Sequence, residues 1–186
     1  RVITCGWSDD VPHPSANDAL QYAEDNGALP VCAVEAPPGP LDSYPAQWRR
    51  GWLASNDERS GSALDLWTGE VLEDFFARPL QATLLAGALE ARGQPTPEAD
   101  EVAPDLFAPT GGWRGRGGVA AAASNPRNDQ TPVPDYHAAP FRGPAAAAGL
   151  IAGAAALVTE LRPDLEPGTV AAALRNGARE DVSGHP

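Results

Sequence analysis

The chain has 186 residues, of which 13 are basic and 25 acidic, so its formal net charge is −12. Every basic residue is an arginine, which excludes chemistry that needs a lysine, such as Schiff-base catalysis or the P-loop phosphate clamp. The acidic balance argues against a nucleic-acid partner, because binding a phosphate backbone needs a basic surface. The length fits one domain, or most of one.

The first residue of the chain and its cysteines do not indicate a cellular compartment. The first residue is Arg1 and not methionine, so we expect an upstream portion and leave the localisation open. The apolar stretch Ala145–Val158 is mostly alanine and glycine and is short for a bilayer, so we expect no membrane span. Cys5 and Cys32 are too few for a disulfide framework and lack metal-ligand spacing. We expect two buried thiols, with no metal and no cofactor.

The first 35 residues have the pattern of a strand, a helix and a second strand. Val2–Trp7 and Leu29–Val34 are short apolar runs that predict buried strands. Between them, Ser15–Asn26 predicts a helix with Ser15 or Asn17 as N-cap and Gly27 as C-cap. A crossover of this length joins parallel strands, so the pattern predicts an α/β protein.

Further elements are expected downstream. Gly51–Ala54 is a possible third strand, and Asp105–Ala108 and Val119–Ala123 predict further short strands. Between them, Pro79–Ala91 predicts an amphipathic helix, because its leucines recur on one stripe. The glycines of residues 111–118 lack the spacing of a nucleotide-binding loop and are interpreted as a flexible connection.

The most informative segment is Gly143–Leu157, which predicts a helix. Its residues are small on every face, so we expect this helix to be packed on all sides and to run through the domain centre. A last helix is expected over Val170–Asn176. Together these elements extend the predicted α/β pattern.

Several motifs, in order, resemble those of one enzyme family. Gly143–Leu157 is similar to G-T-S-x-A-A-P-x-V-A-G-x-A-A-L, and Arg162–Pro167 to N-P-x-L-T-P. Val2–Ser8 is similar to the strand V-I-N-M-S-x-G, Tyr44–Ala46 to Y-P-A, and Ala108–Gly111 to A-P-G. The chain thus resembles the C-terminal half of a subtilisin-like serine protease, a subtilase of the peptidase S8 type. The resemblance implies an α/β fold of three layers, with a mainly parallel sheet and helices on both of its faces.

The resemblance also implies how the chain is organised. Residues 1–186 would be the C-terminal part of one subtilase-like domain, with a family-atypical insertion at about 57–104. The sheet would be incomplete on its N-terminal side, next to the strand that begins after Arg1. An uncovered parallel edge needs a neighbour. We therefore expect a partner, either the protein's own N-terminal fragment or a second subtilase-like chain.

The departures from the family pattern fall on the catalytic positions. The place of the nucleophilic serine is taken by Ala145, and the place of the oxyanion asparagine by Ala36. A methyl group cannot attack a carbonyl, and loss of a serine nucleophile costs about 10⁶-fold in rate. The family holds substrate beside the segment that Gly6, Trp7 and Ser8 resemble, and such backbone pairing needs no catalytic side chain.

The sequence therefore predicts a pseudoprotease, a catalytically inactive domain that acts by binding a peptide or protein or as a scaffold. The alternative is a serine endopeptidase captured as an inactive variant at Ala145. Pro144, Gly149 and Glu35 also differ from the family pattern, which favours natural decay over one engineered change. His137, near Asp135, is interpreted as a loop residue and not as a base.

A third interpretation sets the family aside and treats the chain as an alanine-rich α/β interaction protein. It predicts that Ala145 lies within a continuous helix, away from any cleft. The family interpretation instead predicts Ala145 at a helix N-terminus, where the helix dipole and free amides favour an anion.

Overall fold

The computed structural model of the chain describes the segments that form its core and several short strands around it. The described residues are 1–7, 13–34, 52–53, 63–64, 71–72, 76–77, 82–89, 104–110, 119–124 and 136–178.

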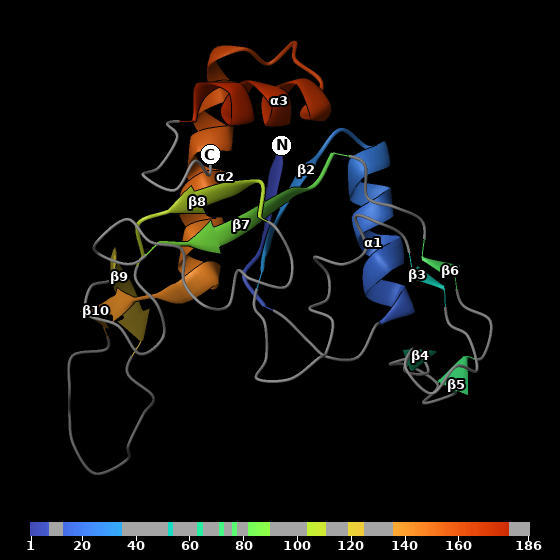
Figure 1. The fold of residues 1–186 in the computed structure, drawn as a ribbon, viewed down its shortest axis with the longest axis horizontal. Coiled ribbons are helices and arrows are strands. Elements are labelled where there is room, and N and C mark those ends of the chain that lie inside the picture. Colours follow the sequence, from blue (N-terminus) through green and yellow to red (C-terminus); the bar gives the residue numbers. More distant parts are fainter. Residues whose placement is uncertain are drawn as a thin grey trace.

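A sheet of four parallel strands lies at the centre of the molecule (Figure 1). Its order is β1 (Val2–Cys5), β2 (Leu29–Ala33), β7 (Leu84–Ala88) and β8 (Leu106–Ala108). All five residues of β2 and of β7 are buried, which is typical of central parallel strands covered on both faces. The strands predicted at Val2–Trp7, Leu29–Val34 and Asp105–Ala108 are thus confirmed.

The remaining described strands form three antiparallel pairs. They are β3 (Trp52–Leu53) with β6 (Phe76–Ala77), β4 (Ala63–Leu64) with β5 (Val71–Leu72), and β9 (Val119–Ser124) with β10 (Tyr136–Phe141). The strand predicted within Gly51–Ala54 forms as β3 but lies outside the parallel sheet. The strand predicted at Val119–Ala123 is confirmed as β9.

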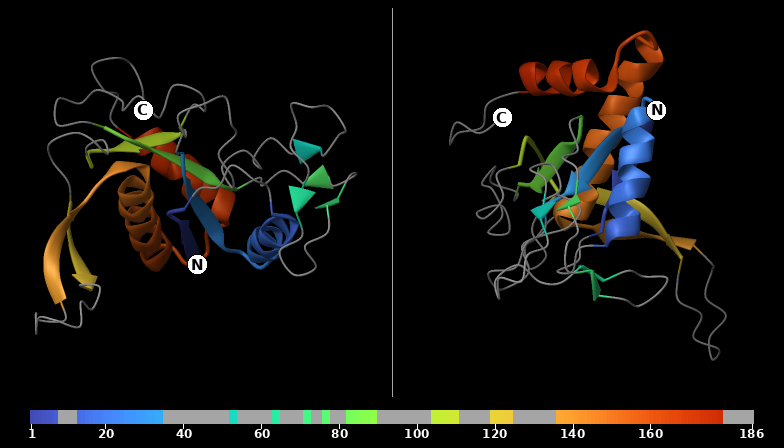
Figure 2. Two further views of the ribbon diagram at one scale, coloured as in Figure 1. Left: turned by 90° about the horizontal axis from the view of Figure 1, so that it is seen from below. Right: turned by 90° about the vertical axis from the view of Figure 1, so that its right-hand side faces the viewer.

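The two faces of the parallel sheet are covered by different helices. Helix α1 (Pro14–Asp25) and helix α2 (Gly143–Leu161) lie on opposite sides of β1 and β2 (Figure 2, left). Since side chains alternate along a strand, Val31 and Leu84 face the same side, while Cys32 and Leu85 face the other. The predicted α/β class, with a parallel sheet and helices on both faces, is confirmed.

The core lies between the sheet and α2. Helix α3 (Pro167–Gly177) also contributes to it, through Val170 and Ala171. The core residues are Leu29, Val31, Ala33, Leu84, Ala86, Ala88, Leu106, Ala108, Ala147, Ala148, Ile151, Ala152, Ala155, Val170 and Ala171. The many alanines bring α2 close to the strands, since small side chains allow a short distance between layers.

Helix α1 begins one residue earlier and ends one residue earlier than predicted. Pro14 occupies the first turn and His13 is the N-cap, so neither Ser15 nor Asn17 has that role. Proline suits this place because its missing N–H would have no helical acceptor there. At the other end, Gly27 has a φ of 75° and its N–H donates to the Glu24 carbonyl at 2.9 Å. The C-cap is Asn26, so the glycine predicted as the cap is the left-handed residue that follows it and closes the helix.

Helix α2 is confirmed, but it is not packed on all sides. Its first six residues are buried, whereas Leu150, Leu157 and Leu161 are 42%, 64% and 79% exposed. By length and composition alone α2 could cross a membrane, and 44% of that window is buried inside the protein. The sequence misled here because alanine and glycine do not show which face of a helix meets the core.

The helix predicted over Pro79–Ala91 is wrong. Leu84–Ala88 forms the central strand β7, whose residues are all buried and which packs against α2. A run of four or five apolar residues fits a buried strand as well as one face of a helix. Here the pairing of β7 with β2 and β8 decides the structure.

Candidate functional site

The end of β1 meets the first turn of α2. Ala145 lies in that turn and is 6% exposed. Gly6 follows β1 directly, and a Cβ placed on Gly6 would lie 3.6 Å from the Cβ of Ala145. The structure thus brings together two residues that the sequence analysis assigned to one site.

A hydrogen-bonded junction fixes the start of α2. Gly143, the first residue of α2, has a φ of 75°, a backbone conformation that favours glycine. The fully buried hydroxyl of Thr110 donates to the Gly143 carbonyl oxygen at 3.1 Å. The N–H of Thr110 donates to the Ala108 carbonyl oxygen at 2.9 Å, so β8 and α2 are held together. Sequence reasoning missed Thr110, although its place two residues after a predicted strand was a signal.

The first turn of α2 carries no group able to act as a nucleophile. Residues 143–148 are glycine, proline and four alanines, and all of them are buried. A hydroxyl, thiol or carboxylate is needed for covalent catalysis, and a methyl group offers none of these. This turn supplies no group that could attack a peptide bond.

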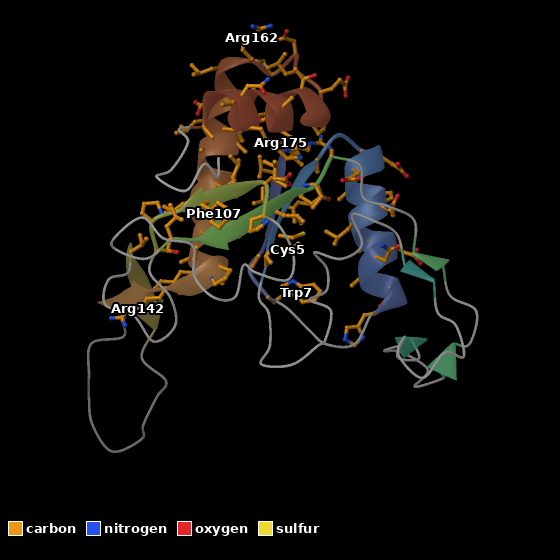
Figure 3. The ribbon with its side chains drawn as sticks, viewed as in Figure 1. Cys5, Trp7, Phe107, Arg142, Arg162 and Arg175 are labelled. Carbon is orange, nitrogen blue, oxygen red and sulfur yellow. The ribbon has the colours of Figure 1, made fainter. Side chains whose placement is uncertain are left out.

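Beside this turn, β1 forms one edge of the parallel sheet. Within the part of the chain that the structure describes, no strand pairs with its outer side. Ile3 is 37% exposed, and Trp7 beyond the end of the strand is 43% exposed. Figure 3 shows Trp7 next to the end of β1, near Cys5. An edge strand with exposed apolar side chains is a template for pairing with another chain.

The backbone of β1 presents alternate residues to the open side. The Leu29 N–H donates to the Arg1 carbonyl oxygen at 3.0 Å, so Arg1 faces β2. In a parallel ladder the next residue points the opposite way. The backbone groups of Val2 and Thr4 are therefore directed outward, where an added strand would bind.

Two cysteines lie side by side where β1 and β2 end. Cys5 and Cys32 are register partners and both are free and buried, as predicted. The Cys32 thiol donates a hydrogen bond to the Cys5 sulfur, which lowers the pKa of Cys5. The same hydrogen bond, together with burial, raises the pKa of Cys32.

Two carboxylates anchor the elements around the site. The Glu24 carboxylate on α1 accepts hydrogen bonds from the Ala82 N–H and the Thr83 hydroxyl, each at 3.0 Å. The Asp105 carboxylate accepts a hydrogen bond from the Leu85 N–H at 2.9 Å and pairs with Arg175 at 3.2 Å. Figure 3 shows Arg175 on α3, above the sheet. The contacts of Glu24 and Asp105 stabilise β7. Because each carboxylate has a structural role of its own, the two do not form a pair for acid–base catalysis.

The remaining predicted site residues are only partly described. Gly6 and Trp7 are described, whereas Ser8 and Ala36 lie outside the described residues, as does Asp135. His137 lies in strand β10, so its assignment to a loop is wrong. No group of three His, Cys, Asp or Glu side chains fit to hold a metal ion occurs among the described residues.

Comparison with known proteins gives a likeness of fold. No family model matches the chain, and no curated protein matches it. A solved structure described as an S41 psychrophilic protease matches 99% of this chain and 55% of its own, with a TM-score of 0.50 and 16% identity. The MycP3 protease from the type VII (ESX-3) secretion system matches 97% of this chain and 48% of its own, with a TM-score of 0.49 and 21% identity.

A third structure, MycP1 with the N-terminal propeptide removed, matches 98% of this chain and 56% of its own, with a TM-score of 0.49 and 20% identity. The chain thus spans about half the length of these three proteases. At such identities the likeness concerns the fold alone.

The assignment to the subtilisin-like protease family is wrong as a sequence-based identification. No family model matches the chain, and the first of the solved proteases above shares only 16% of its residues. The motifs consist largely of alanine, glycine and proline, and a chain with 19 glycines and 20 prolines matches such patterns through composition. The finding that stands is the architecture: this chain has a protease-like α/β fold.

Proposed function

We propose that this chain binds an extended polypeptide along the outer edge of β1 and does not cleave it. The observation that carries the proposal is the open edge of β1, with exposed Ile3 and Trp7, beside a helix turn that offers only methyl groups and a proline ring. Strand addition uses backbone hydrogen bonds for affinity and side-chain contacts for specificity.

The edge provides both kinds of contact. Val2 and Thr4 direct their backbone N–H and C=O groups outward, as the alternation from Arg1 requires. Ile3 and Trp7 offer apolar surface, and an exposed aromatic is a frequent anchor in binding sites. These groups span the whole length of β1, which is enough for a bound segment of several residues.

The bound segment belongs to a second polypeptide of basic character. The formal net charge of −12 favours a basic partner and speeds its approach. Helix α2 contacts β1 and exposes Leu150, Leu157 and Leu161, so a larger partner finds further apolar surface there. Several exposed leucines on one helix are typical of a protein interface.

The proposed absence of cleavage is supported by the groups described at the site. Peptide hydrolysis needs a nucleophile or an activated water, with donors for the oxyanion. At the junction of β1 and α2, the side chain nearest to Gly6 is the methyl group of Ala145. Among the described residues, the first turn of α2 offers a bound backbone no nucleophile, and this supports a binding role.

The test is an anisotropy titration with a fluorescein-labelled octapeptide of alternating valine and arginine. We expect saturable binding, and the Thr4→Pro variant weakens it at least tenfold, because proline removes one outward N–H. Thr4→Val is the matched control, because it keeps the N–H and the strand propensity. Circular dichroism and urea unfolding establish that both variants are folded.

The peptide recovered after incubation is examined by mass spectrometry, and we expect it to be intact. Equal affinity of the wild type and Thr4→Pro would contradict the proposed edge, and fragments of the peptide would contradict the absence of cleavage.

A further inference from the structure

Cys5 and Cys32 are placed as a disulfide requires. They face each other across the β1–β2 pairing, on the same side of the sheet. Neighbouring strands lie about 4.8 Å apart, which falls within the range of about 4.4–6.8 Å between the Cα atoms of bridged cysteines. As register partners on adjacent strands, the two side chains lie next to each other on one face of the sheet.

We propose that Cys5 and Cys32 form a redox-responsive dithiol, which closes to an intramolecular disulfide in the presence of a low-molecular-weight disulfide such as oxidised glutathione. In the first step the Cys5 thiolate attacks one sulfur of the oxidant, and one glutathione thiol leaves. In the second step Cys32 loses its proton and attacks Cys5, and the second glutathione thiol leaves. Two thiols are oxidised, and one disulfide is reduced to two thiols.

The order of attack follows from the surroundings of the two sulfurs. Cys5 accepts the hydrogen bond from Cys32, which lowers its pKa and raises its thiolate fraction. Cys32 is fully buried, and its hydrogen bond to Cys5, its burial and the negative charge of Glu24 all raise its pKa. Cys5 lies at the end of an edge strand, next to exposed Gly6 and Trp7, where local opening exposes it first.

Closure fastens the edge strand to its neighbour. The disulfide encloses the segment between positions 5 and 32, which contains all of α1. Closing a loop of this size restricts the unfolded chain, so we expect the Tm to rise by about 5–10 °C. Formation of the disulfide thereby strengthens the attachment of β1 to β2. This effect does not depend on whether a polypeptide binds at the outer edge of β1.

The experiment oxidises the whole folded protein with oxidised glutathione and maps the products by peptide mass spectrometry without reduction. The expected product is a peptide linking Cys5 to Cys32, with loss of both thiols. In the Cys32→Ala variant we expect a lasting glutathione adduct on Cys5. In Cys5→Ala we expect Cys32 to stay reduced, because it is fully buried.

The wild-type product decides the proposal even where a variant fails to fold. A lasting glutathione adduct on the wild type, a disulfide between two copies of the chain, or two thiols that react only after unfolding would each overturn it. A titration of the linked peptide against the ratio of oxidised to reduced glutathione then measures its redox equilibrium.

Discussion

Phe107 on β8 lies directly over the backbone of Gly87 on β7. A Cβ placed on Gly87 would be 2.8 Å from the Phe107 ring and 2.6 Å from the Pro104 side chain. Gly87 and Phe107 are register partners, so neither strand can move aside without disturbing the centre of the sheet. Glycine is therefore required here by packing and not by backbone conformation.

Replacing this glycine tests the packing of the sheet. Gly87→Ala forces a methyl group into occupied space, and we expect it to lower the free energy of unfolding by about 1–3 kcal/mol. Gly153→Ala, on the exposed face of α2, is the matched control, because a Cβ at Gly153 would meet nothing within 4 Å. We expect the control to stabilise the protein by about 0.5–1 kcal/mol in urea unfolding. Equal effects of the two changes would contradict the described packing.

The ion pair between Asp105 and Arg175 connects α3 to the sheet. Asp105→Ala removes both the acceptor for the Leu85 N–H and the partner of Arg175, and we expect a loss of about 2 kcal/mol. Asp105→Asn keeps an acceptor for the Leu85 N–H, so its loss is smaller, about 1 kcal/mol. Urea unfolding of both variants, with Arg175→Ala to complete a double-mutant cycle, measures the coupling. A coupling of zero would show that the pair contributes nothing.

We expect that introducing a hydroxyl at the start of α2 does not create a protease. In Ala145→Ser the new hydroxyl lies in a buried turn of alanines, and no base is found in that turn to take its proton. We expect a flat progress curve with fluorogenic peptide substrates. Sustained hydrolysis by this variant would instead support an endopeptidase captured in an inactive form.

The two thiols differ in reactivity toward iodoacetamide. The pKa of Cys5 is lowered and that of Cys32 raised, so alkylation at neutral pH labels Cys5 first. The rate at Cys5 rises with pH and levels off below the ordinary thiol pKa. In Cys32→Ala the hydrogen bond is lost, so the pKa of Cys5 rises and its labelling at neutral pH slows. Peptide mass spectrometry over a pH series measures both rates, and faster labelling of Cys32 would contradict the assignment.

The sequence predicted the elements whose signals are local. Strand β1, helix α1 with its Gly27 end, strand β2 and helix α2 all have the expected type and nearly the expected bounds. The buried state of Cys5 and Cys32 was also predictable, because both lie in short apolar runs. These features depend on residues close together in the chain.

Features set by distant contacts were not predictable in the same way. Leu84–Ala88 has a helix-like pattern but forms β7, because it pairs with β2 and β8 from far along the chain. The exposed leucines of α2 were missed because alanine and glycine fill both of its faces. The family motifs misled for a related reason, since small residues at parallel strand ends and close helix contacts arise from packing as well as from descent.

Amide hydrogen exchange on β1 tests the central claim most directly. Binding of the valine–arginine octapeptide is predicted to slow the exchange of the Val2 and Thr4 amides at least tenfold, because those groups are directed outward and become paired. The amides of Ile3 and Cys5, which face β2, change little. Saturable binding of the peptide with unchanged exchange at Val2 and Thr4 would contradict the account.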